Sequence, residues 1–269
     1  MLWRFVSTQT KYRLLFLFYT SPAVLGIGYP LYRLWIGGRP FLWGALLIVA
    51  IAAMLYLDWL YLPLFDPSGL SIHRGTAGKG RVALTFDDGP NGSTTAAILD
   101  VLARHGAHAT FFCIGRLAAE QPELLRRMIK EGHAIGNHSQ DHRKLAWLNR
   151  REVAHQIDAA QESIARAGVP TPVVFRAPHG VKSLYLFGLL RKRGLRLCAW
   201  SHDIRDFAMP GAAALVELAK DGLQDGAIVL LHDGGGDRSQ TVTALDGILQ
   251  ECRARSLIPV TVPELLSPS

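Results

Sequence analysis

The sequence contains little cysteine. Its 269 residues include only three cysteines, an odd number spread widely along the chain, whereas small disulfide-stabilised domains are rich in this residue. The cysteine content therefore argues against a disulfide framework as the basis of the fold. Cys113 and Cys198 each lie inside an apolar run, so we expect buried thiols at these positions and not metal ligands.

A basic tract of the kind that binds nucleic acid is also missing. The formal net charge is +7, but residues 1–66 contain five Lys and Arg against two Asp and Glu, which leaves 24 against 20 for the rest of the chain. No run of basic residues alternates with aromatic ones, so no nucleic-acid partner is expected. The glycine run at 234–236 lacks the Lys of a P-loop, and we interpret it as a turn.

Apolar residues, in contrast, are abundant near the N-terminus. They make up 49% of the chain, and residues 14–32 and 40–57 are both uncharged and long enough to cross a bilayer as helices. The second run predicts a membrane anchor, with a buried globular helix as the alternative. The first is interrupted by proline and glycine, so it also fits a kinked, re-entrant or interfacial helix. A cleaved signal peptide fits less well because the apolar character resumes after Arg39.

The remainder of the chain has the pattern of an α/β domain. Residues 66–80 are turn-rich and predict a linker between an anchor at 1–65 and a catalytic domain at 81–269. In that domain, short apolar runs alternate with segments of helical periodicity, which is typical of a parallel sheet. The seven expected strands are residues 82–86, 109–114, 134–137, 173–175, 195–200, 227–231 and 258–260. We expect a distorted (β/α) barrel of about seven strands, preceded by one or two transmembrane helices, with an open doubly wound sheet as the alternative.

Polar residues gather where five of these strands end. The five clusters are Asp87-Asp88, His138 to His142, Arg176 to Gly180, His202 to Phe207, and His232-Asp233. Because the carboxyl ends of parallel strands share one face, these side chains are expected to line one crevice. A single cluster has an ordinary explanation in turn chemistry. Five of them on one face predict an active site.

The third strand is followed by two histidines with the spacing of metal ligands. His138 and His142 are four residues apart, so they would share one face if the loop opens into a helix. One carboxylate from Asp87-Asp88 would complete a set of two histidines and one carboxylate, which leaves coordination positions for water and substrate. The other carboxylate would then be available as a general base.

The order and wording of the clusters resemble the polysaccharide deacetylases of the NodB-homology family, also called carbohydrate esterase family 4. The resemblance extends from about Arg81 to Leu265 and includes five family motifs in order. Carried over to this sequence, it implies that Asp87 is the general base and that Arg176 holds it. It also implies a divalent metal, usually zinc with Co²⁺, Ni²⁺ and Mn²⁺ as alternatives, and the implied ligands are Asp88, His138 and His142.

The same resemblance implies an acid and a sugar cleft. His232 would be the general acid, oriented by Asp206. The residues implied to line the cleft are Leu230, at the acyl methyl group, Phe207, Pro178 and His179. Phe207 stands where the family commonly has Trp, which keeps an aromatic wall. His179 replaces a common Tyr and changes the polarity of the cleft.

Amide hydrolysis needs groups of these kinds. An amide carbonyl is a poor electrophile, so a metal must polarise it while a base takes a proton from the attacking water. The amine must leave protonated, and histidine has the reference pKa nearest neutrality for that task. The sequence therefore predicts a metal-dependent carbohydrate N-deacetylase, acting on an N-acetylated cell-envelope glycan or a lipid-linked amino sugar. The alternative is a sugar- or metal-binding module that has lost catalysis, and the presence of Asp87, Arg176 and His232 argues against it.

The side of the membrane on which the catalytic domain lies depends on how many of the two apolar runs span the bilayer. If both span, six basic residues flank them on the side of the domain, against two in the connecting loop, and the positive-inside rule places the domain in the cytoplasm. If only residues 40–57 span, five basic residues precede the helix and three follow, and the domain lies outside. We expect a bacterial cytoplasmic membrane and favour its cytoplasmic face, where a lipid-linked precursor would be the substrate.

Overall fold

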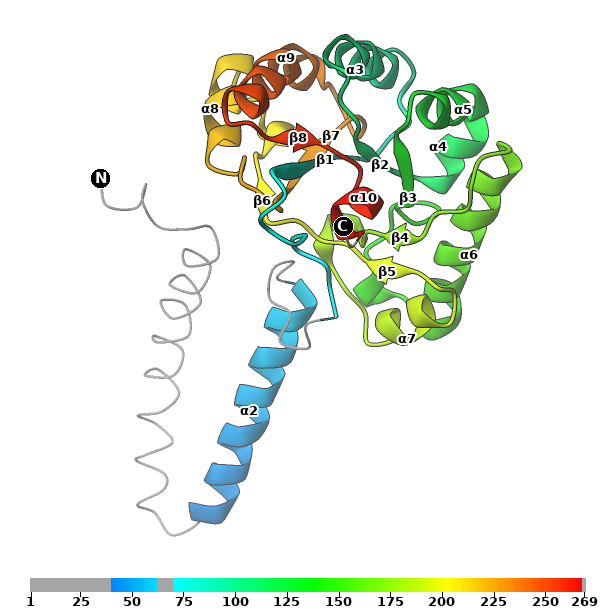
Figure 1. The fold of residues 1–269 in the computed structure, drawn as a ribbon. Coiled ribbons are helices and arrows are strands. Elements are labelled where there is room, and N and C mark those ends of the chain that lie inside the picture. The colour runs from blue at the N-terminus through cyan, green and yellow to red at the C-terminus, as the bar shows by residue number, and fades with distance from the viewer. Residues whose placement is uncertain (1–39, 62–69, 268–269) are drawn as a thin grey trace.

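The computed structural model describes residues 40–61 and 70–267. They form one long helix, α2 (Pro40–Tyr61), and an α/β domain (Figure 1). The strands of the domain are β1 (Arg81–Asp87), β2 (Thr110–Cys113), β3 (Ala134–Asn137), β4 (Val174–Phe175), β5 (Arg196–Leu197), β6 (His202–Asp203), β7 (Ile228–His232) and β8 (Ile258–Pro259).

The strands form an incomplete parallel barrel. Their order is β5-β4-β3-β2-β1-β7-β6, with β8 beside β1, and every pairing between them is parallel. All seven expected strands are present, and the distorted barrel is confirmed. The additional strand β6 was not expected, because its two residues, His202 and Asp203, are polar and form no apolar run.

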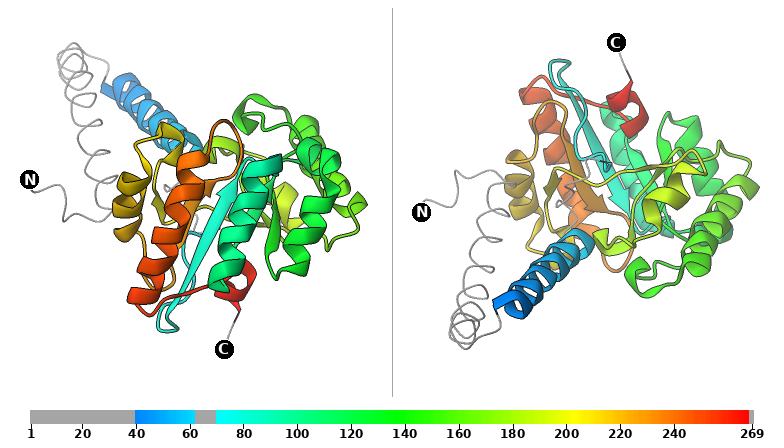
Figure 2. Two further views of the ribbon diagram at one scale, coloured as in Figure 1. Left: turned by 90° about the horizontal axis from the view of Figure 1, so that it is seen from above. Right: turned by 90° about the horizontal axis from the view of Figure 1, so that it is seen from below.

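Helices surround the outer face of the sheet (Figures 1 and 2). They are α3 (Gly92–His105), α4 (Gly115–Glu120), α5 (Pro122–Lys130), α6 (Arg150–Arg166), α7 (Leu186–Arg191), α8 (Ala212–Lys220) and α9 (Ser239–Ala254). Local sequence fixes their ends. The side chain of Asn149 caps the first turn of α6 in a capping box with Glu152, and Gly106 ends α3 in the left-handed conformation that glycine adopts at little cost.

Two apolar layers position the strands. Leu84 and Phe86 on β1 pack outward against the helices, while Ala83 faces a separate core inside the barrel, closed at one end by α10 (Val262–Leu266). Side chains alternate along a strand, so Thr85 and Asp87 share the inward direction of Ala83. The pattern that builds the core therefore also directs Asp87 toward the interior at the end of β1.

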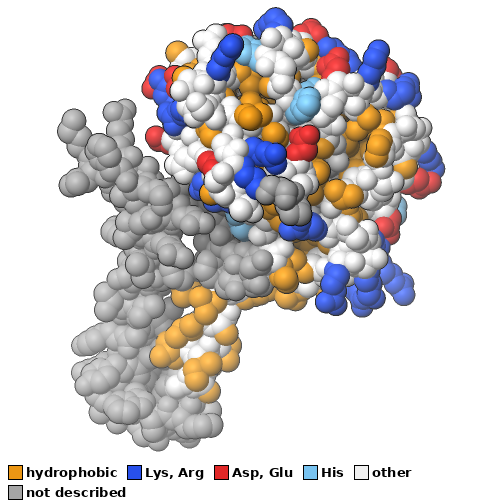
Figure 3. Space-filling model, in the orientation of Figure 1, with side chains coloured by type: hydrophobic (Ala, Val, Ile, Leu, Met, Phe, Trp, Pro, Cys, Tyr) orange, Lys and Arg blue, Asp and Glu red, His pale blue; other side chains and the backbone are white. Residues whose placement is uncertain are grey.

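Helix α2 exposes apolar side chains, among them Leu46, Ile48 and Val49, each more than half exposed. In Figure 3, hydrophobic side chains dominate the described part of this helix, whereas charged side chains of both signs are scattered over the domain. Among residues 40–61 and 70–267, no helix combines the length and apolar character that crossing a bilayer requires. Membrane anchoring by residues 40–57 stays a prediction, and the first apolar run, residues 14–32, lies outside the described residues.

Candidate metal-dependent active site

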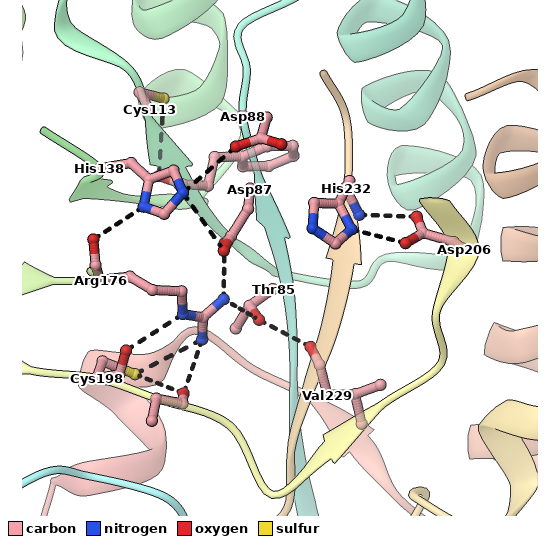
Figure 4. Close-up of polar contacts among 12 residues, drawn as sticks. Thr85, Asp87, Asp88, Cys113, His138, Arg176, Cys198, Asp206, Val229 and His232 are labelled. Carbon is pink, nitrogen blue, oxygen red and sulfur yellow. Dashed lines mark hydrogen bonds and ion pairs between the residues drawn. The ribbon is translucent and has the colours of Figure 1, made fainter. Parts of the chain in front are cut away.

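The carboxyl ends of five strands bring the expected residues together. Asp87 and Asp88 lie at the end of β1, and the other groups follow the carboxyl ends of β3, β4, β6 and β7. Figure 4 shows Asp88 above Asp87, His138 to its left and Arg176 below it, with His232 on the neighbouring strand and Asp206 beside His232. Residues that are up to 145 positions apart in the chain thus converge on one small volume.

Three of these side chains form a cluster that could hold a metal ion. Asp88 Oδ1 lies 3.0 Å from His142 Nε2 and 3.4 Å from His138 Nε2, and one ligand atom from each residue lies within 4.8 Å of the others. Asp88 Oδ1 is buried without a hydrogen bond among the described residues. A buried, unsatisfied carboxylate oxygen between two imidazole nitrogens fits a divalent cation, because that set matches an open zinc site.

The charges of the cluster support the same fit. Burial alone would raise the pKa of the Asp88 carboxyl, but the His138 and His142 rings hold it well below its usual value. Burial disfavours charge on His138, yet Asp87 and Asp88 raise the pKa of its ring. The pocket is thus negative enough to attract positive charge, whether a proton or a metal ion. Nδ1 of His138 faces the carbonyl oxygen of Arg176 at 2.9 Å, which leaves Nε2 for the ion.

A folded loop, and not a helix, brings His138 and His142 together. Residues 138–142 form an irregular loop and not a helix, so the condition under which the two histidines would share a helical face is not met. Ser139 and His142 adopt positive φ angles of 66° and 57°. Asn137 Oδ1 accepts the N–H of Ser139, and Ser139 Oγ accepts the N–H of His142. These two hydrogen bonds fold the loop back, and the two imidazole rings lie 4.9 Å apart.

Asp87 is held in place by a hydrogen bond from Arg176. Arg176 Nη1 donates to Asp87 Oδ1 at 2.7 Å, and both side chains are almost fully buried. Asp87 Oδ2 lies 3.7 Å from His138 Nε2. Arg176 Nη1 also donates to Thr85 Oγ1 at 2.8 Å. Thr85 was missed from the sequence, although its position two residues before Asp87 on the same strand face was a usable signal.

His232 is paired with Asp206. The Nδ1 atom of His232 lies 2.7 Å from Asp206 Oδ1, and Asp206 Oδ2 accepts the main-chain N–H of His232 and the hydroxyl of Thr241. Burial alone would lower the pKa of His232, but the hydrogen bond and charge of Asp206, with the charges of Asp87 and Asp88, raise it to about 9. Thr241 was also missed, because it lies in the first turn of α9, beyond the strand-end motifs.

The residues expected to line the sugar cleft lie around these groups. Phe207 is 53% exposed and packs edge-on against the His232 ring at 5.9 Å. His179 is exposed on the other side and contacts the His142 ring at 4.4 Å, with a positive φ of 56°. Pro178 begins the 3₁₀ turn η3 (Pro178–Gly180), and Leu230 belongs to the barrel-interior core. Their contacts with substrate stay predictions.

Two further acidic residues support the loops. Asp141 accepts from Gln156 on α6, and Asp233 accepts from the Thr95 hydroxyl at 2.6 Å. Asp233 is fully buried, and burial with the nearby charges of Asp88 and Asp87 raises its pKa to about 7, although the Thr95 hydrogen bond opposes the shift. The three cysteines are all free and buried, and burial of Cys113 and Cys198 was expected.

A metal-dependent carbohydrate deacetylase is the class of enzyme that this fold and site define. Residues 74–198 match the family model described as polysaccharide deacetylase. The chain is 37% identical over 206 residues to a chitooligosaccharide deacetylase of Sinorhizobium fredii, covering 72% of this chain and 95% of the relative. It is 39% identical over 187 residues to a peptidoglycan-N-acetylglucosamine deacetylase of Bacillus cereus, covering 69% and 87%.

A solved structure agrees with these relatives. A family 4 carbohydrate esterase from Streptomyces lividans, in complex with acetate, superposes with a TM-score of 0.64 at 33% identity, covering 68% of this chain and 93% of that one. The chain therefore belongs to the polysaccharide deacetylase family, as the order of its motifs predicted.

Proposed function

We propose that the protein hydrolyses the N-acetyl group of an N-acetylglucosamine unit in a cell-envelope glycan or a lipid-linked saccharide. The observation that carries the proposal is the arrangement of two hydrogen-bonded pairs, Asp87 with Arg176 and His232 with Asp206, beside the Asp88 cluster. The substrates named for the similar proteins, chitooligosaccharide and peptidoglycan N-acetylglucosamine, support an N-acetylated amino sugar.

Asp88, His138 and His142 would hold the cation, for which we propose zinc, with Co²⁺, Ni²⁺ or Mn²⁺ as substitutes. A cation bound there polarises the acyl carbonyl and makes water more acidic. The two imidazoles and one carboxylate are ligands that zinc accepts, and such a set leaves coordination positions open. The ligand loop is stabilised by Asn137 and Ser139, so the donor atoms are held before the ion arrives.

Asp87 is the proposed general base. Arg176 binds Oδ1, which leaves Oδ2 as the oxygen that takes a proton from the attacking water. The same hydrogen bond fixes the direction of the Asp87 carboxyl group, whose Oδ2 lies 3.7 Å from His138 Nε2. General-base catalysis by a positioned group typically contributes about 10²- to 10⁴-fold in rate.

His232 is the proposed general acid. Asp206 engages Nδ1, so a proton on Nε2 can be given to the amine nitrogen as the carbon–nitrogen bond breaks. The pKa of about 9 keeps the ring protonated near neutral pH. Protonation is essential because an unprotonated amide nitrogen is a very poor leaving group. Base and acid are thereby two different residues with opposite starting charges.

The cleft residues set the orientation of the sugar in this proposal. Phe207 offers an exposed aromatic face next to the acid, where a sugar ring can pack. His179 offers a polar ring next to the cation ligands. Leu230 lies two residues before His232 on β7, which suits an apolar surface for the acyl methyl group.

A binding module without catalysis is the alternative. A module that only bound sugar or metal would have no need for a buried Arg176 that pairs with Asp87, or for an Asp206 carboxylate that holds His232 in one orientation. Burying a charged group costs desolvation free energy, which only a well-formed pair with an opposite charge offsets. Both pairs are complete here, which favours the enzyme.

We also propose that residues 1–65 attach the enzyme to the bacterial cytoplasmic membrane, with the domain on the cytoplasmic face. The uncharged runs of the sequence and the exposed apolar side chains of α2 support attachment. On that face the substrate would be a lipid-linked amino sugar, because finished wall polymer lies outside.

Mass spectrometry of glycans and lipid-linked sugars, from cells with and without the protein, tests the function. Loss of an acetyl mass from one amino-sugar species only when the protein is present is the expected result, and that species identifies the substrate. Identical mass profiles in cells that produce the folded protein would contradict the proposal.

A further inference from the structure

Residues 71–75 bridge the open side of the barrel, and we call them the closing segment. Strands β5 and β6 are the two ends of the strand order. At one end of the segment, the N–H of Gly75 donates to the carbonyl oxygen of Gly226, just before β7, at 2.8 Å. The other end reaches the chain that leaves β5. Figure 1 shows the segment in cyan beside the connection between β5 and β6.

Ile72 makes the contact on the β5 side. Its N–H donates to the carbonyl oxygen of Leu197, and its carbonyl oxygen accepts the N–H of Ala199, both at 2.8 Å. The Ile72 side chain is 7% exposed and belongs to the core inside the barrel. Ile72 thus pairs with residues 197–199 as a short parallel strand would, and fixes the position of that stretch of backbone.

The same stretch of backbone supplies acceptors for Arg176. Arg176 Nε donates to the carbonyl oxygen of Cys198 at 3.2 Å, and Nη2 donates to that of Ala199 at 2.9 Å. Cys198 is paired with Phe175 on its other side through an N–H···O bond of 2.8 Å. The guanidinium is therefore bound by peptide groups that Ile72 and Phe175 hold from opposite sides.

Arg176 has little freedom to find other partners. It is 1% exposed, and its guanidinium carbon lies 4.0 Å from the centre of the Phe112 ring. Buried donors that lose their acceptors are costly, so a displaced backbone at 198–199 would draw the guanidinium with it. The remaining nitrogen, Nη1, is the one that donates to Asp87.

We propose that Ile72 is a positioning residue for Asp87, acting through residues 197–199 and Arg176. This inference rests on the proposed role of Asp87 as the general base. Ile72 is not one of the three residues of the candidate metal cluster. Its effect is therefore on the placement of the base, and it should appear in kcat while KM and metal content stay unchanged.

The test is made on the full chain with bound zinc. Ile72→Pro removes the N–H that donates to Leu197 and is expected to lower kcat about 10- to 100-fold, because small misplacements of a reacting group have effects of this size. Ile72→Val keeps both main-chain bonds and is expected to retain kcat. Thr76→Pro places the same restriction at a nearby exposed position outside the closing segment and is the matched control.

A double-variant cycle with Arg176→Lys separates positioning from general loss of stability. Lysine keeps the charge of Arg176 but lacks the planar fork that reaches two peptide carbonyls. If Ile72 acts through Arg176, Ile72→Pro should change kcat less than about twofold in the Arg176→Lys background, because linked residues are non-additive. The inference would be overturned if the kcat losses of the two single variants multiply in the double variant. It would also be overturned if a folded Ile72→Pro protein keeps full kcat.

Two further measurements keep the test decisive. If Ile72→Pro does not fold, Ile72→Gly, which loses the buried side chain but keeps the main-chain bonds, should show a smaller kcat loss with the same non-additivity, and additive losses would overturn the inference. Asp87→Asn tests the underlying role of the base separately. If Asp87→Asn stays fully active, the proposed function of Asp87 fails, whatever Ile72 does.

Discussion

Asp87 and His232 are register partners on the neighbouring parallel strands β1 and β7. Neighbouring strands lie about 4.8 Å apart, and partners in register direct their side chains to the same face. The proposed base and acid are therefore separated by a distance that main-chain hydrogen bonds fix. Asp88, the residue that follows β1, belongs to the candidate metal cluster, so the end of this strand presents both the proposed base and a candidate metal ligand.

Replacing any candidate ligand should remove the metal. Asp88→Ala, His138→Ala and His142→Ala each delete one of three donors, so metal content measured by elemental analysis of purified protein should fall steeply. His179→Ala is the matched control, because His179 packs on His142 but is not part of the cluster. Unchanged metal in all three ligand variants would show that the ion binds elsewhere.

The basic limb of the pH–activity profile should depend on Asp206. His232 must be protonated to act as the acid, so activity falls as pH rises through its pKa, which Asp206 raises. A bound cation offsets the charge of Asp88 and places the limb somewhat below 9. Asp206→Asn should move the limb to lower pH, whereas Phe207→Leu, which changes an uncharged neighbour of the ring, should not. A limb that stays in place in Asp206→Asn would remove His232 as the group that titrates.

A chain that begins at residue 70 should fold and deacetylate a small soluble acetylated sugar. All proposed catalytic residues lie beyond this point, and the closing segment is retained. A chain that begins at residue 76 lacks the bonds of Ile72 and Gly75, so it should unfold at a lower temperature and turn over more slowly. Thermal melting and acetate release measure both. A folded but inactive 70–269 protein would mean that the N-terminal residues help to form the site.

Thiol labelling can determine on which side of the membrane the catalytic domain lies. The three native cysteines are buried and free, so the unmodified protein should give no background. A cysteine introduced at Ala77, an exposed residue of the predicted linker, should resist an impermeant reagent on intact cells and react after lysis if the domain is cytoplasmic. Ready labelling of intact cells would place the domain outside and make wall polymer the preferred substrate.

The sequence predicted the barrel and the convergence of polar residues at one of its faces well, because both follow from short-range patterns. Apolar runs located seven strands, and polar residues at five strand ends predicted which side chains converge. Asp87, Arg176 and Asp206 were singled out through their motifs and take part in the hydrogen bonds described above, while their catalytic roles stay predictions.

Other features depend on tertiary contacts that no local pattern records. Thr85 bonds to Arg176 and Thr241 bonds to Asp206, beside the proposed base and acid, from positions that look like ordinary strand and helix residues. The His138–His142 loop is folded by Ser139 and Asn137 and not by a helix, which spacing alone could not distinguish. The role of Ile72 in closing the barrel becomes visible only when residues 197–199 lie beside it.

The most direct test of the account measures acetate and free amine released from an N-acetylglucosamine oligomer by the zinc-loaded protein and by its Asp87→Asn variant. The account predicts equal amounts of acetate and amine from the wild-type protein. It predicts about 10²- to 10⁴-fold slower release from Asp87→Asn with the metal retained, because only the base is lost. Equal rates in the two metal-loaded proteins, or loss of the metal from Asp87→Asn, would contradict it.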